Sequence, residues 1–144
     1  FAHMEEIDFC WRNYNRGGIT YYTNLSKVFH LGGQSLKSSN PKKTFLNFRN
    51  SLLTVTKNTP NPLLLIIIFR LLLDGLAGVK FMIEGKPSHM FSILKAHISY
   101  YKNLIKVLKF RYNNKNRKIY NYEFSIVFKY HILRVKSFMN LKKH

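Results

Sequence analysis

Cysteine and acidic residues are scarce in this sequence, and each shortage excludes a class of protein. Cys10 is the only cysteine among 144 residues, which rules out an internal disulfide and a cysteine-rich zinc site and favours a reducing, intracellular setting. Only 6 acidic residues stand against 24 Lys and Arg, which gives a formal net charge of +18. Such an excess of positive charge predicts an anionic partner, either a nucleic acid, an anionic membrane surface or a phosphate-bearing ligand.

Several nucleotide-binding and nucleic-acid-binding motifs are missing as well. The sequence contains neither a P-loop nor a Gly-x-Gly-x-x-Gly fingerprint, so it is not expected to bind a nucleotide in those ways. It shows no helix-turn-helix, RNA-recognition or zinc-finger signature. Hydrophobic residues nevertheless make up 46% of the chain, a share that excludes disorder by composition and predicts a packed structure.

The chain divides into three units by composition. A Pro/Asn-rich stretch at residues 58–62 predicts the first boundary. The expected units are a compact α/β part, a hairpin of membrane-associating apolar and amphipathic helices, and a basic aromatic tail of unknown role. Their bounds are residues 1–58, 59–110 and 111–144.

The first unit is expected to contain a helix, two strands and a second helix, in that order. Apolar residues at helical spacing predict a helix over residues 3–15. Ser39 or Asn40 can cap another helix that starts with Pro41 and runs to about residue 57. Between these helices, segments rich in β-branched and aromatic residues predict short strands. The strands are expected at residues 19–23 and 27–31.

The second unit is expected to be helical. Residues 62–83 are strongly apolar and are interrupted by Arg70, Asp74 and Lys80. Residues 88–110 have apolar positions at alternating steps of three and four, with lysines between them, which is the pattern of a basic amphipathic helix. The chain as a whole is therefore expected to be mostly helical, with an α/β part at its start.

The charges within residues 62–83 leave the relation of this segment to a membrane open. About 20 apolar residues suffice for a membrane span, but Arg70 and Asp74 near the centre offset most of the favourable free energy of insertion. These two residues are four positions apart and can pair on one face of a helix. A helix that lies in the membrane interface and a buried helix of a soluble core are the alternatives to a span.

Three of the six acidic residues fall within four consecutive positions of the first predicted helix, as Glu5, Glu6 and Asp8. Carboxylates this close repel one another, and such crowding suits a general base, which has to take up a proton at neutral pH. Arg12 lies four residues after Asp8 and can pair with it. The alternative is an acidic first turn that the helix dipole favours.

Four segments carry a resemblance to a known family. Residues 3–12 (HMEEIDFCWR) resemble the acidic E-D/E-x-D-x-x-x-R helix of inverting family 2 glycosyltransferases, which have a GT-A fold. The other three follow in the family's order and resemble its next strand, its V-x-H-x-G-G-x-S segment and its K-x-x-x-x-x-R-N helix. They are residues 19–22 (ITYY), 28–35 (VFHLGGQS) and 40–50 (NPKKTFLNFRN).

The resemblance extends over about residues 1–110, because the apolar and amphipathic helices are similar to the C-terminal appendage of bacterial members. It implies that the chain is the C-terminal part of such an enzyme and that the N-terminal, donor-binding half is absent. The family's Asp-x-Asp metal motif belongs to that half and does not occur in this sequence.

The resemblance assigns roles to the residues of the acidic helix. It implies that Glu6 is the base that deprotonates the acceptor hydroxyl. The family more often has Asp at this position, which leaves Glu5 open as an alternative base. Asp8 would orient the acceptor or support the base, and Trp11 and Arg12 would position the helix.

The resemblance also implies donor-binding residues. His30 stands where the family places a histidine near the donor pyrophosphate or its metal, Gly32 and Gly33 allow a ligand to approach the backbone closely, and Arg49 suits phosphate through its planar fork. A histidine satisfied by the backbone, an ordinary turn and a solvated arginine are the respective alternatives. The implied cofactor is a divalent cation, Mg²⁺ or Mn²⁺, which the absent half would mostly hold and for which His30 is a candidate ligand.

The implied activity is the transfer of a sugar, with inversion, from a nucleotide sugar to a glycan acceptor that is expected to be lipid-linked. The fragment alone is expected to be inactive. The basic amphipathic helix predicts an anionic membrane surface as a partner. The resemblance implies that this surface is the cytoplasmic face of the inner membrane and that the enzyme acts in the synthesis of cell-envelope polysaccharide. No nucleic acid is expected as a partner. The alternative is a basic module that binds nucleic acid or a membrane surface without catalysis.

Overall fold

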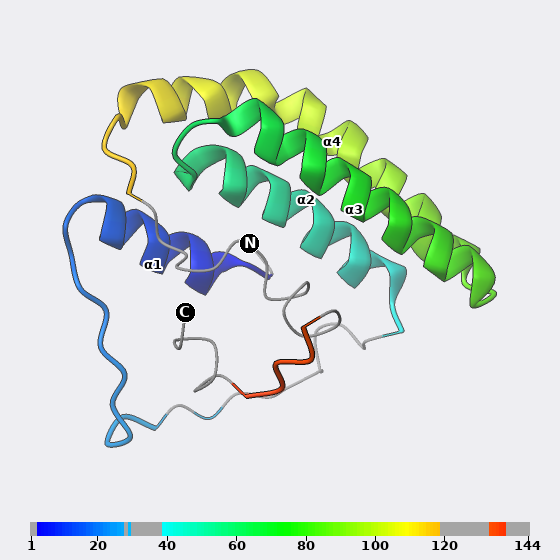
Figure 1. Cartoon of the computed structure of the whole chain (residues 1–144), viewed down its shortest axis with the longest axis horizontal. Coiled ribbons are helices and arrows are strands. Elements are labelled where there is room, and N and C mark those ends of the chain that lie inside the picture. The colour runs from blue at the N-terminus through cyan, green and yellow to red at the C-terminus, as the bar shows by residue number, and fades with distance from the viewer. Residues whose placement is uncertain (1–2, 28, 30–38, 119–132, 138–144) are drawn as a thin grey trace.

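The computed structural model describes residues 3–27, 29, 39–118 and 133–137, and these contain four helices. Three of the helices, α2, α3 and α4, lie side by side, and α3 runs in the opposite direction to the other two (Figure 1). The remaining helix, α1, packs against α2. The helices are α1 (Glu5–Asn15), α2 (Pro41–Asn58), α3 (Leu63–Ile83) and α4 (Pro87–Asn113).

Glycines in the left-handed conformation end α1 and α3. The φ angle is 89° at Gly17 and 69° at Gly85, values that a residue without a side chain adopts at little cost. The N–H that follows each glycine donates to a carbonyl one turn back, as in a Schellman motif. The predicted end of the first helix at residue 15 is confirmed. The two bonds run from Gly18 to Asn13 at 2.9 Å and from Lys86 to Phe81 at 2.8 Å.

The start of α2 carries one of the two predicted caps. Asn40 Oδ1 accepts a hydrogen bond from the Lys42 main-chain N–H at 2.9 Å, and Pro41 occupies the first helical position. The helix ends at Asn58, one residue beyond its predicted end. Helices α3 and α4 also begin within one residue of the predicted positions, and α4 runs three residues further than predicted.

A small apolar core lies where α2 meets α3 and α4. Leu52 is completely buried, and Tyr100 is 2% exposed. This core joins α2, which belongs to the first predicted unit, to α4, which belongs to the second. The division between the two units stays a prediction. The buried side chains of the core are Leu52, Leu53, Ile67, Tyr100 and Val107.

Two buried hydrogen bonds fix α4 against α2. The Thr56 hydroxyl donates to the Leu52 carbonyl at 2.8 Å and lies 2.9 Å from Tyr100 Oη. Since the single hydroxyl proton of Thr56 goes to Leu52, Tyr100 is the donor of the second bond. About three turns earlier, Thr44 Oγ1 lies 2.7 Å from His89 Nδ1. The two bonds set the register of the helices, because sliding either helix leaves buried polar atoms without partners.

The prediction of two strands is wrong, and with it the α/β class of residues 1–58. No strand is present in the described residues: 19–23 are irregular, and of the second segment only residues 27 and 29 are described, neither in a strand. Tyr21 and Tyr22 are 81% and 93% exposed. The high β-propensity of these residues is not enough, because a strand forms only when a neighbouring strand accepts its backbone hydrogen bonds.

The apolar helix α3 contains the ion pair that its spacing predicts, with Arg70 Nε 3.0 Å from Asp74 Oδ1. Among the described residues, no helix has the length and hydrophobicity that crossing a membrane requires.

Candidate functional site

The three acids at the start of α1 have different surroundings. Glu5 and Glu6 are exposed, whereas the side chain of Asp8 is 14% exposed. Two residues correspond to about 200° around a helix axis, so Glu6 and Asp8 lie on nearly opposite faces of α1. Asp8 faces α2, and Glu6 therefore faces solvent.

Asp8 joins α1 to the C-terminal end of α2. Its Oδ2 accepts hydrogen bonds from Arg12 Nε at 3.0 Å and Lys57 Nζ at 2.8 Å, and its Oδ1 accepts one from Asn58 Nδ2 at 2.8 Å. The pairing with Arg12 was predicted from the spacing and is confirmed. Lys57 and Asn58 lie about fifty positions away in the sequence, so sequence reasoning missed them. These contacts make Asp8 a residue that positions α1.

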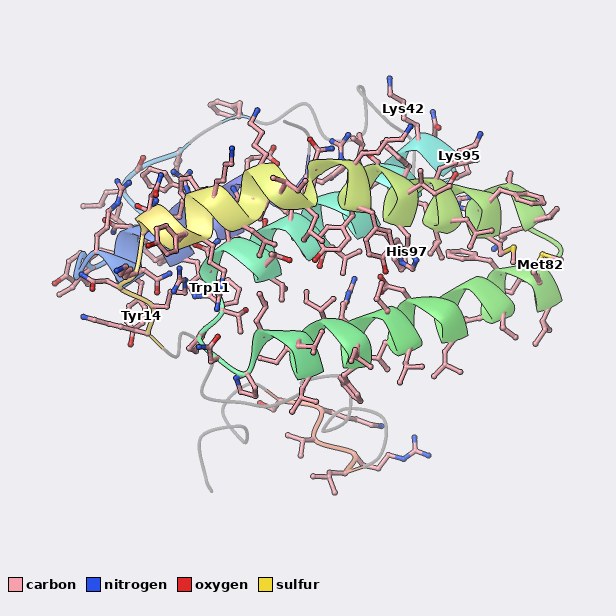
Figure 2. All side chains as sticks on the ribbon, turned by 90° about the horizontal axis from the view of Figure 1, so that it is seen from above. Trp11, Tyr14, Lys42, Met82, Lys95 and His97 are labelled. Carbon is pink, nitrogen blue, oxygen red and sulfur yellow. The ribbon has the colours of Figure 1, made fainter. Side chains whose placement is uncertain are left out.

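Two residues further along α1 add to this attachment. Trp11 is 7% exposed, and its side chain lies on the packed side of the helix (Figure 2). Asn15 Nδ2 donates to the Asn58 carbonyl at 3.3 Å. The helix is thus held along its length, and its first turn carries Glu5 and Glu6 in a defined place.

A buried asparagine of α2 fixes the backbone that enters α1. His3 and Met4 have φ angles of 71° and 72°, a conformation that is uncommon outside glycine and persists where the surroundings impose it. Asn50, which is 1% exposed, donates from Nδ2 to the His3 carbonyl at 3.1 Å. Because the acidic turn follows directly, Asn50 helps to position Glu5 and Glu6. The sequence motif contains both Arg49 and Asn50, but it assigned a role only to Arg49.

The predicted donor-binding residues are only partly within the described residues. Arg49 is half-buried, its Nε donates to Asn50 Oδ1 at 3.0 Å, and its guanidinium lies 5.0 Å from the centre of the Phe45 ring. Both partners belong to α2, so the role of Arg49 toward phosphate stays a prediction. His30, Gly32 and Gly33 lie outside the described residues.

The predicted divalent cation is not tested by the structure. In the part of the chain that is described, no three His, Cys, Asp or Glu side chains come together as metal ligands do. Glu5, Glu6 and Asp8 do not form such a group, since Asp8 faces α2 and Glu6 faces solvent. His30 as a ligand and Mg²⁺ or Mn²⁺ as the cofactor both stay predictions.

A second polar cluster lies between α3 and α4. Asp74, with its side chain 2% exposed, has Oδ2 3.1 Å from His97 Nε2 and Oδ1 3.0 Å from Arg70 Nε. The contact with Arg70 has the distance of an ion pair but not the geometry of a hydrogen bond. The Arg70 guanidinium also lies 5.7 Å from the centre of the Phe48 ring of α2. Sequence reasoning found the Arg70 pair but missed His97, which faces Asp74 only because α3 and α4 form a hairpin.

We expect Asp74 to make the stability of the fold depend on pH. Burial raises the pKa of the Asp74 carboxyl, while Arg70 and His97 act in the opposite direction with less effect. The folded state therefore binds this proton more tightly than the unfolded state. The resulting stabilisation is present below the unfolded pKa of about 4 and is lost as the pH rises through the folded pKa. The stability of the native protein relative to the Asp74→Asn variant should thus fall as the pH rises above about 4.

Urea unfolding at several pH values measures this difference, and Glu84→Gln supplies a control of opposite sign. Lys86 and Lys80 lower the pKa of the exposed Glu84 carboxyl. The stability of the native protein relative to Glu84→Gln should therefore rise with pH over the acidic range. If the native protein gained stability over Asp74→Asn as the pH rose, the account of the Asp74 cluster would be wrong.

No protein family, curated protein or solved structure matches the chain. The family resemblance thus rests on the sequence motifs, and the function below is argued from those motifs together with the geometry of α1.

Proposed function

We propose that the chain is the acceptor-side, C-terminal part of an inverting glycosyltransferase, with Glu6 as its general base. The observation that carries the proposal is that Asp8 and Glu6 have different surroundings at the start of α1. Asp8 is bound by three donors and anchors α1, whereas Glu6 lies on the opposite face and is free to meet a substrate. An acidic first turn that merely favours the helix dipole needs no such anchoring.

The proposed reaction is a direct displacement at the anomeric carbon of a nucleotide sugar. Glu6 takes the proton of an acceptor hydroxyl while that oxygen attacks the anomeric carbon. The bond from the anomeric carbon to the diphosphate oxygen breaks, and the nucleoside diphosphate leaves with the electron pair. The new glycosidic bond forms on the face opposite the leaving group, and the proton remains on Glu6 until it passes to solvent.

The positioning residues matter because a general base works only within hydrogen-bond distance of the proton that it removes. Asp8 and Trp11 hold α1 against α2, and Asn50 fixes the backbone just before the acidic turn. None of the three needs to touch the substrate. Their replacement is expected to act through the placement of Glu6.

We also propose that the protein works at an anionic membrane surface, where a lipid-linked acceptor is found. The outer face of α3 carries a stripe of exposed apolar side chains, between 47% and 83% exposed, on the side opposite the buried Asp74. Four exposed lysines form a stripe along α4, and each is worth about 1 kcal/mol next to anionic lipid. The stripes comprise Leu65, Ile68, Leu72, Leu76, Val79 and Ile83 on α3, and Lys95, Lys102, Lys106 and Lys109 on α4.

A transfer assay tests the proposed function. Membranes from cells that express the complete gene product are incubated with radiolabelled UDP-glucose, UDP-N-acetylglucosamine, GDP-mannose or dTDP-rhamnose. We expect one donor to label glycan or lipid-extractable material in these membranes and not in membranes without the protein. Absence of labelling from all four donors, with the folded protein present in the membranes, would count against glycosyl transfer.

A further inference from the structure

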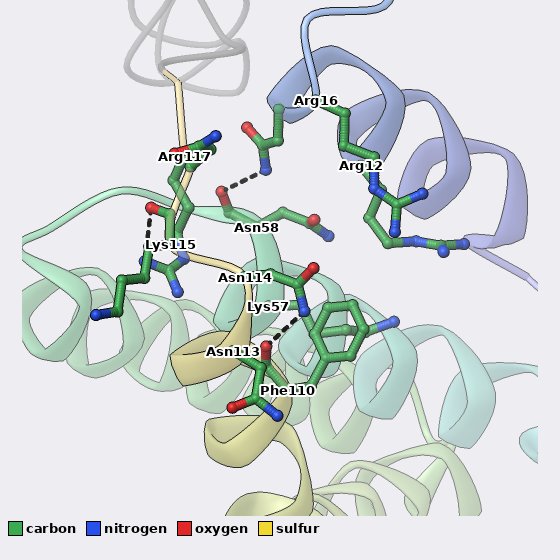
Figure 3. A pocket seen from close by; sticks show the side chains of 11 residues that line it. Arg12, Arg16, Lys57, Asn58, Phe110, Asn113, Asn114, Lys115 and Arg117 are labelled. Carbon is green, nitrogen blue, oxygen red and sulfur yellow. Dashed lines mark hydrogen bonds between the residues drawn. The ribbon is translucent and has the colours of Figure 1, made fainter.

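A cavity of about 330 Å³ lies where the C-terminal end of α4 passes the ends of α1 and α2 (Figure 3). Asparagines and one phenylalanine form part of its wall, and no residue that lines it is acidic. The basic side chains come from three separate parts of the chain, so sequence reasoning did not group them. They are Arg12, Arg16, Lys57, Lys115 and Arg117.

The cavity carries more positive charge than the nearby acidic residues neutralise. Arg12 and Lys57 share the single carboxylate of Asp8. The other three cations, Arg16, Lys115 and Arg117, form no ion pair with any acidic residue among those that the structure describes. A concave surface with several cations and one partly shared acid attracts and concentrates anions.

Arg117 is half-buried and adds to this excess because it lies next to the buried Arg111. Its Nη2 donates to the main-chain carbonyl of Arg111, and the Arg111 guanidinium in turn donates to the Thr56 and Thr59 carbonyls at 3.0 and 2.5 Å. Burial lowers the pKa of Arg117, and burial together with the charge of Arg117 lowers the pKa of Arg111. Both guanidinium groups have neutral oxygens as their hydrogen-bond partners, and an anion in the cavity would offset the repulsion between their charges.

We propose that this cavity binds a phosphate-bearing ligand with at least two negative charges, such as a diphosphate. The planar guanidinium group of an arginine can bind two phosphate oxygens at once. The side-chain amides of the lining asparagines can donate further hydrogen bonds. The volume is at the lower end of the range of small-molecule sites, roughly 300–1,000 Å³, which suits a small anion. This inference does not rest on the proposed glycosyl transfer.

Calorimetric titration of the 144-residue chain with inorganic pyrophosphate tests the proposal. We expect saturable binding with one pyrophosphate per chain. The double variant Arg16→Gln/Lys115→Gln removes two exposed cations of the cavity, and it should weaken binding by about tenfold or more. Both side chains are exposed, so the fold should be unaffected, which the circular dichroism spectrum checks.

The matched control is Lys27→Gln/Lys42→Gln, which removes the same charge from exposed positions outside both the cavity and the lysine stripe of α4. Its affinity for pyrophosphate should stay within about twofold of the native value. An equal loss in both double variants would mean that pyrophosphate responds only to net charge and would overturn the proposal. Absence of saturable binding to the native chain, together with equal vesicle binding by both variants, would overturn it as well.

A second arm distinguishes free phosphate compounds from lipid headgroups as the source of the ligand. It measures the binding of the same three proteins to vesicles that contain phosphatidic acid. If the cavity takes a lipid headgroup, Arg16→Gln/Lys115→Gln should lose more vesicle binding than the Lys27→Gln/Lys42→Gln control. If it takes a free diphosphate, the two variants should lose vesicle binding equally while only the first loses pyrophosphate binding.

Discussion

Replacing Glu6 by glutamine should lower the rate of sugar transfer by about 100- to 10,000-fold in the complete gene product. The amide has nearly the same shape as the carboxylate but cannot take up the proton of the acceptor hydroxyl. Because the Glu6 side chain is exposed, the substitution should leave the unfolding free energy within about 0.5 kcal/mol of the native value. The measurement is the transfer rate in the membrane assay, at equal amounts of folded protein.

Glu5→Gln is the matched control for this prediction. Glu5 is exposed in the same turn, and the sequence left it open as an alternative base. Around the axis of α1, Glu5 lies about 60° from Asp8, which faces α2. Glu6 lies on nearly the opposite face. Transfer by Glu5→Gln should therefore stay within a few-fold of the native rate. The reverse result, with Glu6→Gln nearly normal and Glu5→Gln inactive, would remove Glu6 as the base.

Replacing Asp8 by alanine should cost about 2–4 kcal/mol of unfolding free energy. The substitution leaves Lys57 and Asn58 without the carboxylate that accepts their hydrogen bonds, and it removes the main polar link between α1 and α2. Removing one partner from a largely buried charged cluster lowers the free energy of unfolding by more than the whole cluster contributes. The reason is that the remaining groups stay away from water and lose their partner. Urea unfolding measures the loss, and Glu5→Ala, at an exposed position, should change stability by no more than about 0.5 kcal/mol.

Tryptophan fluorescence reports the same change at α1 itself. Trp11 is the only tryptophan of the chain and is 7% exposed. If Asp8 anchors α1, its emission in native buffer should shift to longer wavelength in Asp8→Ala, because the indole becomes accessible to water. Unchanged emission together with unchanged unfolding would show that Asp8 does not hold the helix.

The helices could be predicted because their signals are local. Asn40 with Pro41 marks the start of α2, and Gly17 and Gly85 mark the ends of α1 and α3. Caps of this kind act within one turn, so they can be read without knowing the tertiary structure. The pairs Asp8–Arg12 and Arg70–Asp74 were predicted for the same reason, since residues four apart on a helix are neighbours.

The strands could not be judged from the sequence in the same way. Residues 19–23 have the composition of a strand, but whether they form one depends on a neighbouring strand that composition does not reveal. The described residues provide no such partner, and the segment is irregular. High β-propensity alone is therefore not sufficient to predict a strand at these residues.

The contacts that define the site join residues far apart in the sequence. They could not be predicted, because local sequence patterns do not show which helices pack together. Asp8 with Lys57, Asn50 with His3, and Asp74 with His97 each join residues between 23 and 49 positions apart. They follow from how α1 packs on α2 and how α3 returns along α4. One signal was available: an aspartate within an apolar helix needs a partner, and the neighbouring amphipathic helix contains histidines.

The anomeric configuration of the transferred sugar tests the central claim most directly. A donor whose sugar is α-linked to the diphosphate is supplied in the membrane assay, and the product is examined by proton NMR. A single carboxylate base with direct displacement predicts a β-linked product. An α-linked product would contradict the account, because retention requires a different reaction course from the one assigned to Glu6.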